Sequence, residues 1–465
     1  MKRSLSTASA WPALALQQTL AKLSELQGGA HSAELLSSAA ARSAKARWPE
    51  ALADADAACE LGWCALHTGH WRAVDAVWRQ MYMASAYLAA QAALQAGVCG
   101  AVAAALRRID LGLMLGDFTF RPQLLAAAER LEQAREGREA APATSAAATS
   151  ATADADTAAA AVDADAADDD ELPPSPPACS STSAALRPLT GSLSPLPRLR
   201  LPPLAYFFNE CMQPGQPAVL TGAMAGWPAM SSRPWSDLAY LKRVAGHRTV
   251  PVEMGAHYLD DGFDERLMTL AEYLEHHVQP TVGGGGGEAG EAVDEVDARR
   301  RTPPAYLAQH ALFEQLPRLR DDIAVPDYCL LSLEDSDDCG DSEGEGGGGA
   351  AEPRINAWLG PAGTVSPLHH DRYHNLLSQA VGSKYVRLYA PSLREALYPH
   401  TEGPHAGVSS QVVDLDADHA ARFPRFGAAP YADVVLNAGE MLYIPPGWWH
   451  YVESRETSFS VSFWW

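Results

Sequence analysis

The chain has 465 residues, which is long enough for two domains joined by a linker. Its formal net charge of −22 is concentrated in two runs, Asp154–Glu171 and Glu334–Glu352, which each carry eight acidic residues and no Lys or Arg. The rest of the chain carries only about −6 and has no long basic stripe, which argues against binding to nucleic acid backbones. We interpret the acidic runs as solvated insertions.

The cysteines indicate a reducing compartment, and we expect the nucleus, the cytoplasm or both. No two of them form a C-x-x-C pair, which argues against a disulfide framework and against a structural zinc module. No stretch approaches 18 uninterrupted apolar residues, so we expect a soluble protein without a membrane partner. The first 25 residues are rich in Ser and Ala, and a short organellar transit peptide is therefore kept as an alternative.

Residues 11–135 have helix-forming composition, rich in Ala, Leu, Glu, Gln and Arg, and predict an all-α domain. Breaks at Gly28-Gly29, Leu66–His70 and Gly97–Gly100 suggest five or six antiparallel helices. A set of aromatic residues falls near helical spacing and is interpreted as the core of a bundle or solenoid, with a peptide-binding groove as the alternative. The set consists of Trp63, Trp71, Trp78, Tyr82 and Tyr87.

Residues 136–197 are dominated by Ala, Thr, Asp, Ser and Pro, and too few large apolar side chains are present to offset the entropy of ordering. We therefore predict a long disordered linker. Two further low-complexity segments, 283–302 and 332–353, are expected to be surface loops inserted into the second domain.

The second domain, residues 198–465, contains short β-type runs bounded by Gly, Pro or Asp. Many short strands separated by turns predict a sandwich or a barrel, decorated by helices at 235–245 and 270–277. The predicted strands are 217–222, 248–252, 355–359, 375–381, 384–389, 441–444 and 458–465.

His369, Asp371 and His450 are the candidate metal ligands. On a strand, residues two apart share a face, so His369 and Asp371 point together while His370 points away. A β run, a Pro-Pro-Gly bend and His450 follow downstream, and this segment could place His450 beside the first pair. Two imidazoles and one carboxylate form the facial triad typical of non-heme Fe(II) oxygenases.

Two other interpretations of these residues stay open. His370 and His374 are four apart and would meet only on a helix, which the strand-like residues after His374 disfavour. Alternatively, His369 and His450 are hydrogen-bonded core histidines and Asp371 caps a turn.

A buried cation would extend the site, because a 2-oxo acid bound to the metal carries a second carboxylate. Lys384 lies on the strand after Gly382 and could pair with that carboxylate, although an exposed strand lysine is an equal interpretation. Asn375, Ser366 and Tyr328 offer neutral hydrogen-bonding groups near the same mouth.

Taken together, these motifs resemble the jumonji-C (JmjC) family of Fe(II)- and 2-oxoglutarate-dependent oxygenases, and within it the lysine demethylase 8 subgroup. The resemblance covers about Leu204 to Trp465, and residues 66–71 also resemble the helical domain of that subgroup in plants and algae. One departure is His370, which stands where the family usually has Gln. The matching segments are Ile355–Trp358 with Gly363, Ser366–Asp371, Lys384–Tyr389 and Ser458–Trp465.

The resemblance implies an α+β fold in which the linker leads into a double-stranded β-helix of cupin or jelly-roll type. It implies that His369, Asp371 and His450 bind Fe(II) and that Lys384 binds 2-oxoglutarate. It also implies which neutral residues line the cofactor pocket, with Trp464 near the closing strand. These are Asn375, Ser366, Tyr328, Trp358 and Trp464.

The function implied by the family is that of a 2-oxoglutarate-dependent dioxygenase that consumes O2 and acts on a protein side chain. Two outcomes stay open, namely demethylation of lysine in a histone tail by a chromatin regulator, and hydroxylation of an arginine-containing protein. A non-catalytic regulatory protein that keeps the fold as a binding platform is the alternative from another class. A cupin that uses its metal without 2-oxoglutarate is disfavoured by Lys384.

Overall fold

The computed structural model describes residues 13–68, 74–139, 193, 195–260, 262–279, 304–333, 352–415 and 421–465. The predicted linker, 136–197, and the predicted insert at 332–353 lie mostly outside these residues, and the insert at 283–302 lies wholly outside them. Among the described helices, none combines the length and the apolar character that crossing a lipid bilayer requires.

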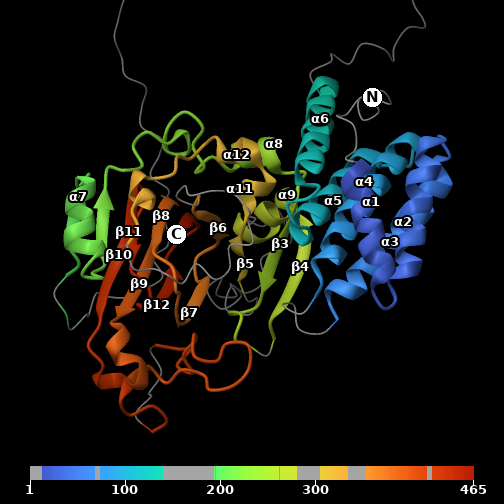
Figure 1. Ribbon diagram of the computed structural model, residues 1–465. Helices are drawn as coiled ribbons and strands as arrows, with labels where there is room; N and C mark the ends of the chain where they lie inside the picture. The colour runs from blue at the N-terminus through green and yellow to red at the C-terminus, as the bar shows by residue number, and fades with distance from the viewer. Residues whose placement is uncertain are drawn as a thin grey trace, which may run out of the picture.

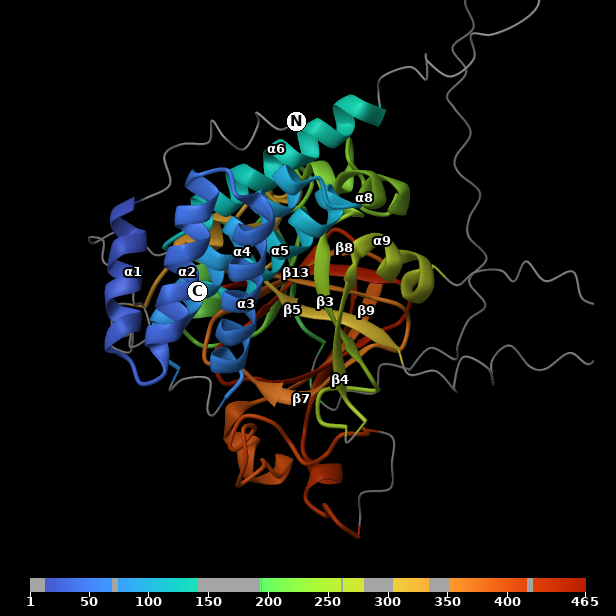
Figure 2. The same cartoon turned by 90° about the vertical axis from the view of Figure 1, so that its right-hand side faces the viewer.

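The amino-terminal domain is all-α, as predicted, and each helix packs against the next one along the chain (Figures 1 and 2). Helix α4 is the central helix, because most of its length is buried among its neighbours. Asp75 caps its first turn, and Gly97 ends it in the left-handed conformation. The helices are α1 (Ala13–Glu25), α2 (Gly29–Ala44), α3 (Trp48–Leu66), α4 (Ala76–Ala96), α5 (Ala101–Leu115) and α6 (Arg121–Glu139).

The predicted aromatic core of this domain is only partly right. Tyr82 and Tyr87 are buried, and Trp78 packs against the core from its edge. Trp63 is 39% exposed, because it projects from α3 onto the surface, where its ring stacks on His67 at 4.1 Å. Trp71 lies outside the described residues.

The second domain is a β structure with short helices at its periphery. Its first strands are β1 (Arg198–Arg200), β2 (Ala218–Thr221), β3 (Thr249–Met254), β4 (Asp264–Thr269) and β5 (Ala305–His310). The strands that follow are β6 (Arg354–Gly360), β7 (Val365–His370), β8 (Asn375–Val381), β9 (Ser383–Tyr389), β10 (Ala432–Asn437), β11 (Glu440–Ile444), β12 (Trp449–Ser454) and β13 (Ser458–Trp464).

The helical pieces of this domain include the two that the sequence predicts. Helix α8 lies within the predicted 235–245, and α9 with the π-helical turn η4 matches the predicted 270–277. The α-helices are α7 (Leu204–Phe207), α8 (Leu238–Ala245), α9 (Leu270–Tyr273), α11 (Leu312–Gln315) and α12 (Pro317–Arg320). The shorter turns are η2 (Phe208–Met212), η3 (Pro228–Met230), η4 (Leu274–Val278), η5 (Asp327–Leu330), η6 (Pro391–Leu397) and η7 (Phe426–Ala428).

The strands form two sheets that together make the expected double-stranded β-helix. The larger sheet has the order β1-β2-β11-β8-β13-β6-β5-β3-β4, and the smaller sheet has the order β10-β9-β12-β7. From β6 to β9 successive strands alternate between the sheets, and β10 to β13 return to them in the same interleaved way. The functional site lies between these sheets, because both contribute inward-facing side chains to one cavity.

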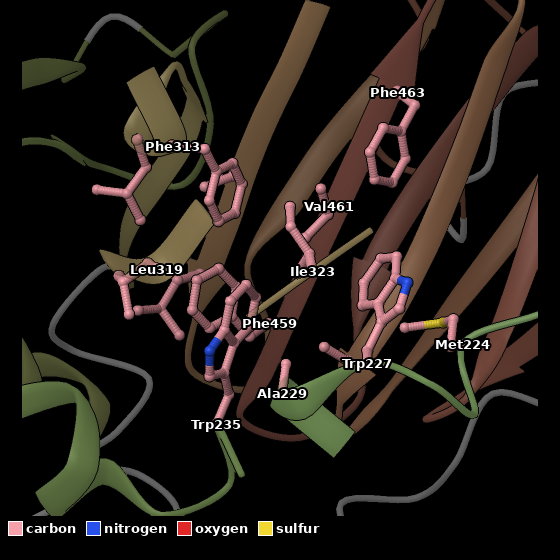
Figure 3. Packing of buried hydrophobic residues seen from close by; sticks show 14 of the residues in the cluster. Met224, Trp227, Ala229, Trp235, Phe313, Leu319, Ile323, Phe459, Val461 and Phe463 are labelled. Atoms are coloured by element: carbon pink, nitrogen blue, oxygen red, sulfur yellow. The ribbon is translucent and has the colours of Figure 1, made fainter. Parts of the chain in front are cut away.

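A cluster of large aromatic side chains supports the larger sheet (Figure 3). Trp235 is fully buried and lies between Phe459 of β13, at 4.3 Å between ring centroids, and Phe313 of α11, at 5.7 Å. The indole Nε1 of Trp235 donates to the buried carboxylate of Asp322. This stack joins β13 to the covering helices and thereby stabilises the back of the barrel.

Replacing Phe459 with Ala should destabilise the second domain. Its ring is 1% exposed and stacks on Trp235, so the truncation leaves a cavity that costs about 3–5 kcal/mol. Denaturant titration followed by circular dichroism measures this loss. Leu330→Ala is the control, because Leu330 is 62% exposed and its truncation should change the free energy of unfolding by less than about 0.5 kcal/mol. Equal stability of the two variants would contradict this account of the core.

Candidate metal centre and cofactor pocket

The pairing of β7 with β12 brings His369 and His450 together. The strands are antiparallel, and His450 is the direct cross-strand partner of His369, with ring centroids 4.2 Å apart. Asp371 follows the end of β7, and its carboxylate turns toward the same point. One ligand atom from each of the three residues lies within 4.8 Å of the others. Two nitrogen donors and one carboxylate at this spacing fit a divalent transition metal.

Backbone carbonyl groups fix the orientation of both imidazoles. The Nδ1 atom of His369 lies 2.7 Å from the carbonyl oxygen of Pro367, and Nδ1 of His450 lies 3.0 Å from that of Trp448. A carbonyl partner at Nδ1 selects the tautomer whose Nε2 lone pair is free, as in most histidine ligands of metals. Burial, and then the neighbouring His369, lower the pKa of His450, which favours the neutral ring that a metal requires.

The Asp371 carboxylate has an unfilled hydrogen-bonding position. Its Oδ2 atom is buried and has no hydrogen-bond partner among the residues that the structure describes, and Nε2 of His450 lies 3.7 Å away, beyond hydrogen-bond distance. The backbone N–H of Gly447 donates to the backbone carbonyl of Asp371 at 2.7 Å, so the predicted Pro-Pro-Gly bend holds this residue in place. Gly447 has φ +76°, a conformation that favours glycine. A metal ion bound here would satisfy the orphaned oxygen.

The competing pair of His370 and His374 is not brought together. His370 faces the opposite side of β7, where its ring packs edge-on against Trp449 and its Nε2 contacts the carbonyl oxygen of Gly407. His374 stacks on Trp465, and its Nδ1 lies 2.8 Å from the hydroxyl oxygen of Tyr443. Burial lowers the pKa of His374 to about 4, so this ring is a neutral packing residue.

A fully buried lysine lies in the same cavity. Lys384 is 1% exposed, and its Nζ donates to the hydroxyl of Tyr306 at 2.8 Å. No carboxylate lies within ion-pairing distance of Lys384 in the described parts of the chain. Burial lowers its pKa to about 7, because desolvation disfavours the ammonium. A bound ligand with a carboxylate would restore the missing counter-charge.

Most of the predicted neutral residues line this cavity. Ser366 hydrogen-bonds Tyr306, and Trp358 donates from its indole nitrogen to Ser462 at 2.9 Å. In the described part of the chain, the buried Oδ1 atom of Asn375 and Nε1 atom of Trp464 have no hydrogen-bond partner, which leaves an acceptor and a donor for a ligand. The residues that line the cavity are Tyr306, Trp358, Ser366, His369, Asp371, Asn375, Leu377, Lys384, Ile444, His450, Val452, Ser462 and Trp464.

Tyr328, which the resemblance implies for the pocket, is not among the residues that line this cavity, whereas Tyr306 is. Tyr328 lies in η5, outside the residues that line the cavity, where its hydroxyl donates to the carbonyl oxygen of Pro202 and its ring packs on Phe207. Tyr306 is the second residue of β5, and a Pro-Pro pair at 303–304 separates this strand from the predicted loop 283–302. The β-type run at 305–307 is the signal that could have identified it.

Comparisons with known proteins cover both domains. A family model described as a cupin-like domain matches residues 204–465, and one described as KDM8-like, N-terminal ARM repeats matches residues 15–147. The chain is 35% identical to Lysine-specific demethylase JMJ30 of Arabidopsis thaliana over 88% of this chain and 85% of that protein. It is 33% identical to Lysine-specific demethylase 8 of Xenopus tropicalis, over 87% of this chain and 86% of that protein.

A more distant relative has a different printed activity. The chain is 28% identical to the bifunctional peptidase and (3S)-lysyl hydroxylase JMJD7 of Homo sapiens over 60% of this chain and 87% of that protein. The names of the relatives therefore include both demethylases and a hydroxylase.

Removal of either predicted ligand should abolish tight metal binding. Asp371→Ala and His450→Ala each remove a donor atom. Mutation of a residue that only orients a metal ligand lowers metal affinity by up to roughly 100-fold, so we expect the affinity for Co(II) or Mn(II) to fall by more than that. Isothermal titration of the purified chain measures the change. His370→Gln is the matched control, because His370 faces away from the site and should leave metal affinity within about threefold. Unchanged binding in Asp371→Ala would remove that residue from the ligand set.

Proposed function

Because the chain belongs to the cupin-like JmjC family of lysine-specific demethylase 8, we propose that it is an Fe(II)- and 2-oxoglutarate-dependent oxygenase of protein side chains. The proposed substrates are lysyl or arginyl residues. The observation that carries the proposal is that the buried Lys384, which has no carboxylate partner among the described residues, shares a cavity with the triad of His369, Asp371 and His450.

Different residues of the cavity would bind the metal and 2-oxoglutarate. Nε2 of His369, Nε2 of His450 and the Asp371 carboxylate would hold the metal and leave its remaining positions open. Lys384 and Tyr306 would bind the far carboxylate of 2-oxoglutarate by a charge-assisted and a neutral hydrogen bond. When bound, Fe(II) and 2-oxoglutarate together activate O2 and yield succinate, CO2 and an oxidised C–H bond.

The walls of the cavity protect that chemistry from water. Leu377, Ile444 and Val452 line it with apolar surface from three different strands, and Trp358 and Trp464 add aromatic faces. Excluding water strengthens the electrostatic contacts of Lys384 and prevents side reactions. The chain's own contribution is therefore orientation, counter-charge and a dry environment.

A pair of carboxylates near the cavity supports the proposal that the substrate side chain is cationic. Glu253 of β3 lies directly opposite Glu265 of β4, and burial, and then Glu265, raise the pKa of Glu253 to about 7. Glu253 lines a second cavity whose wall includes Tyr306, which also lines the metal cavity. No cation pairs with Glu253 in the described part of the chain, so a lysyl or arginyl side chain would supply the missing charge.

Demethylation and hydroxylation share the first event, the insertion of oxygen into a C–H bond. If the carbon is an N-methyl group, the product loses formaldehyde and the methyl group is removed. If the carbon belongs to the side chain itself, the hydroxyl stays. Both outcomes are included in the proposal, because the printed names of the relatives include both activities.

Purified protein with Fe(II), ascorbate and 2-oxoglutarate should form succinate in the presence of histone-tail or arginine-rich peptides. Mass spectrometry of the peptides then distinguishes loss of a methyl group from gain of one oxygen atom. Glu253→Gln should lower kcat/KM for the cationic peptide by about 10- to 100-fold, as expected for losing a hydrogen bond to a charged group. Absence of both 2-oxoglutarate binding and succinate formation would instead favour a non-catalytic binding protein.

Binding of 2-oxoglutarate should be coupled to proton uptake. The pKa of Lys384 is lowered to about 7 in the free protein, so near pH 8 the side chain is mostly neutral, whereas a bound carboxylate favours the ammonium. We expect close to one proton taken up per ligand, and an affinity that falls by up to about tenfold per pH unit above about pH 7. Calorimetry in two buffers of different ionisation enthalpy measures this uptake. Lys384→Met should eliminate it, and buffer-independent heats for the unsubstituted protein would contradict the assignment.

A further inference from the structure

A buried ionic cluster joins the helical domain to the catalytic domain. Arg248, which immediately precedes β3, donates from Nε and Nη2 to Oδ1 of Asp110 on α5 at 2.9 and 2.6 Å. Its Nη1 donates to Oε1 of Glu132 on α6 at 2.7 Å. Arg248 is 1% exposed and Asp110 is fully buried, so this cluster is an interior feature of the molecule.

The second carboxylate oxygen of Asp110 completes the hydrogen bonding at the start of β3. Its Oδ2 accepts the backbone N–H of Thr249 at 2.8 Å. The side-chain amide of Gln315 donates to Oδ1 of Asp110 and to the carbonyl oxygen of Thr249, both at 2.8 Å. The Oε1 atom of Gln315 lies 2.7 Å from Nε2 of His310, the last residue of β5. One side chain of the helical domain thus anchors the ends of two strands of the catalytic domain.

Those two strands lead to the candidate site. Glu253, near the other end of β3, pairs with Tyr306 near the start of β5. Tyr306 in turn accepts the hydrogen bond from Lys384 in the metal cavity. Figure 1 shows α5 beside β3, at the side of the barrel where the helical domain lies.

The charges explain why the domains should not separate. In the described residues, both carboxylates that pair with Arg248 come from the helical domain. Separation would break these ion pairs and the hydrogen bonds of Asp110 to Thr249 and Gln315, and it would undo the packing of α5 against β3. Removing one partner of a buried ion pair is strongly unfavourable, whereas exposed pairs contribute little.

We propose that the helical domain is a docked, integral part of the oxygenase, and that Asp110 and Arg248 position β3 and β5 for the cofactor pocket. The positioning role rests on the proposed function, whereas the docking does not. The alternative is a helical domain that is tethered by its linker and contacts the catalytic domain only when both bind the same substrate. Asp110 and Arg248 are positioning residues, because they act on the site through Tyr306 and Glu253.

The docking is tested by cutting the folded, full-length protein once within residues 140–190, at an introduced protease site. We expect the two halves to elute together from a sizing column at low micromolar concentration. In Arg248→Met, the dissociation constant of the two halves should rise at least about 100-fold, because Asp110 and Glu132 lose their buried counter-charge. Separation of the unsubstituted halves, or equally tight association in Arg248→Met, would overturn the proposal.

The matched control is Arg318→Met, which removes an ion pair between the same two domains. Arg318 of α12 pairs with Glu136 of α6, and the two side chains are 43% and 44% exposed. This change should alter the association of the halves by less than about fivefold. Should Arg248→Met fail to fold, Arg248→Lys keeps the charge but loses the two-pronged geometry and should give an intermediate dissociation constant.

Kinetics of the uncut protein separate positioning from stability. We expect Arg248→Met to raise the KM for 2-oxoglutarate by about tenfold, because Tyr306 shifts relative to Lys384. Loss of folded protein alone would lower the apparent kcat and leave KM unchanged, and that result would overturn the positioning role. If the unsubstituted protein forms no succinate, the proposed function fails, and the elution of the cut protein still decides whether the domains are docked.

Discussion

The antiparallel pairing of β7 with β12 is the constraint on which the candidate site depends. It makes His450 the cross-strand neighbour of His369, and the bend before β12 holds the backbone of Asp371 through Gly447. Closure of the barrel then adds Lys384 from β9 and Asn375 from β8 to the same cavity. A change of register by one residue would turn His450 to the opposite face and dismantle the triad.

The interior of the barrel retains polar groups without protein partners among the described residues. There, Lys384 hydrogen-bonds the neutral hydroxyl of Tyr306, and buried atoms of Asp371, Asn375 and Trp464 have no hydrogen-bond partner. Such groups reduce the stability of the folded chain, so their presence together in one cavity indicates that a ligand completes them. The cluster around Arg248 differs, because every charge there is paired across the two domains. One buried set is therefore suited to binding, and the other to holding the domains in place.

Local patterns predicted the helical domain, many of the strands and the triad geometry, but not β1, β4, β5 or β10, and contacts between distant segments were harder to predict. Strand alternation correctly separated His369 and Asp371 from His370, since side-chain direction on a strand depends only on its immediate neighbours. Tyr306 was missed because β5 follows the low-complexity segment 283–302 closely, and its residues show no simple alternation, in keeping with the irregular pairing of β5 with β6. The Asp110–Arg248 pair gave no signal, because its partners are far apart in sequence and each looks like an ordinary surface charge.

We propose that the triad and Lys384 form one site for Fe(II) and 2-oxoglutarate. Chelation of Fe(II) by a 2-oxo acid gives a visible charge-transfer absorption, which can be recorded on the purified protein in the absence of O2. The band should appear when both are added to the unsubstituted protein, and it should be lost in Asp371→Ala. Lys384→Met should need a much higher concentration of 2-oxoglutarate to produce the band. If the folded, unsubstituted protein shows no band at saturating Fe(II) and 2-oxoglutarate, the triad and Lys384 do not form such a site.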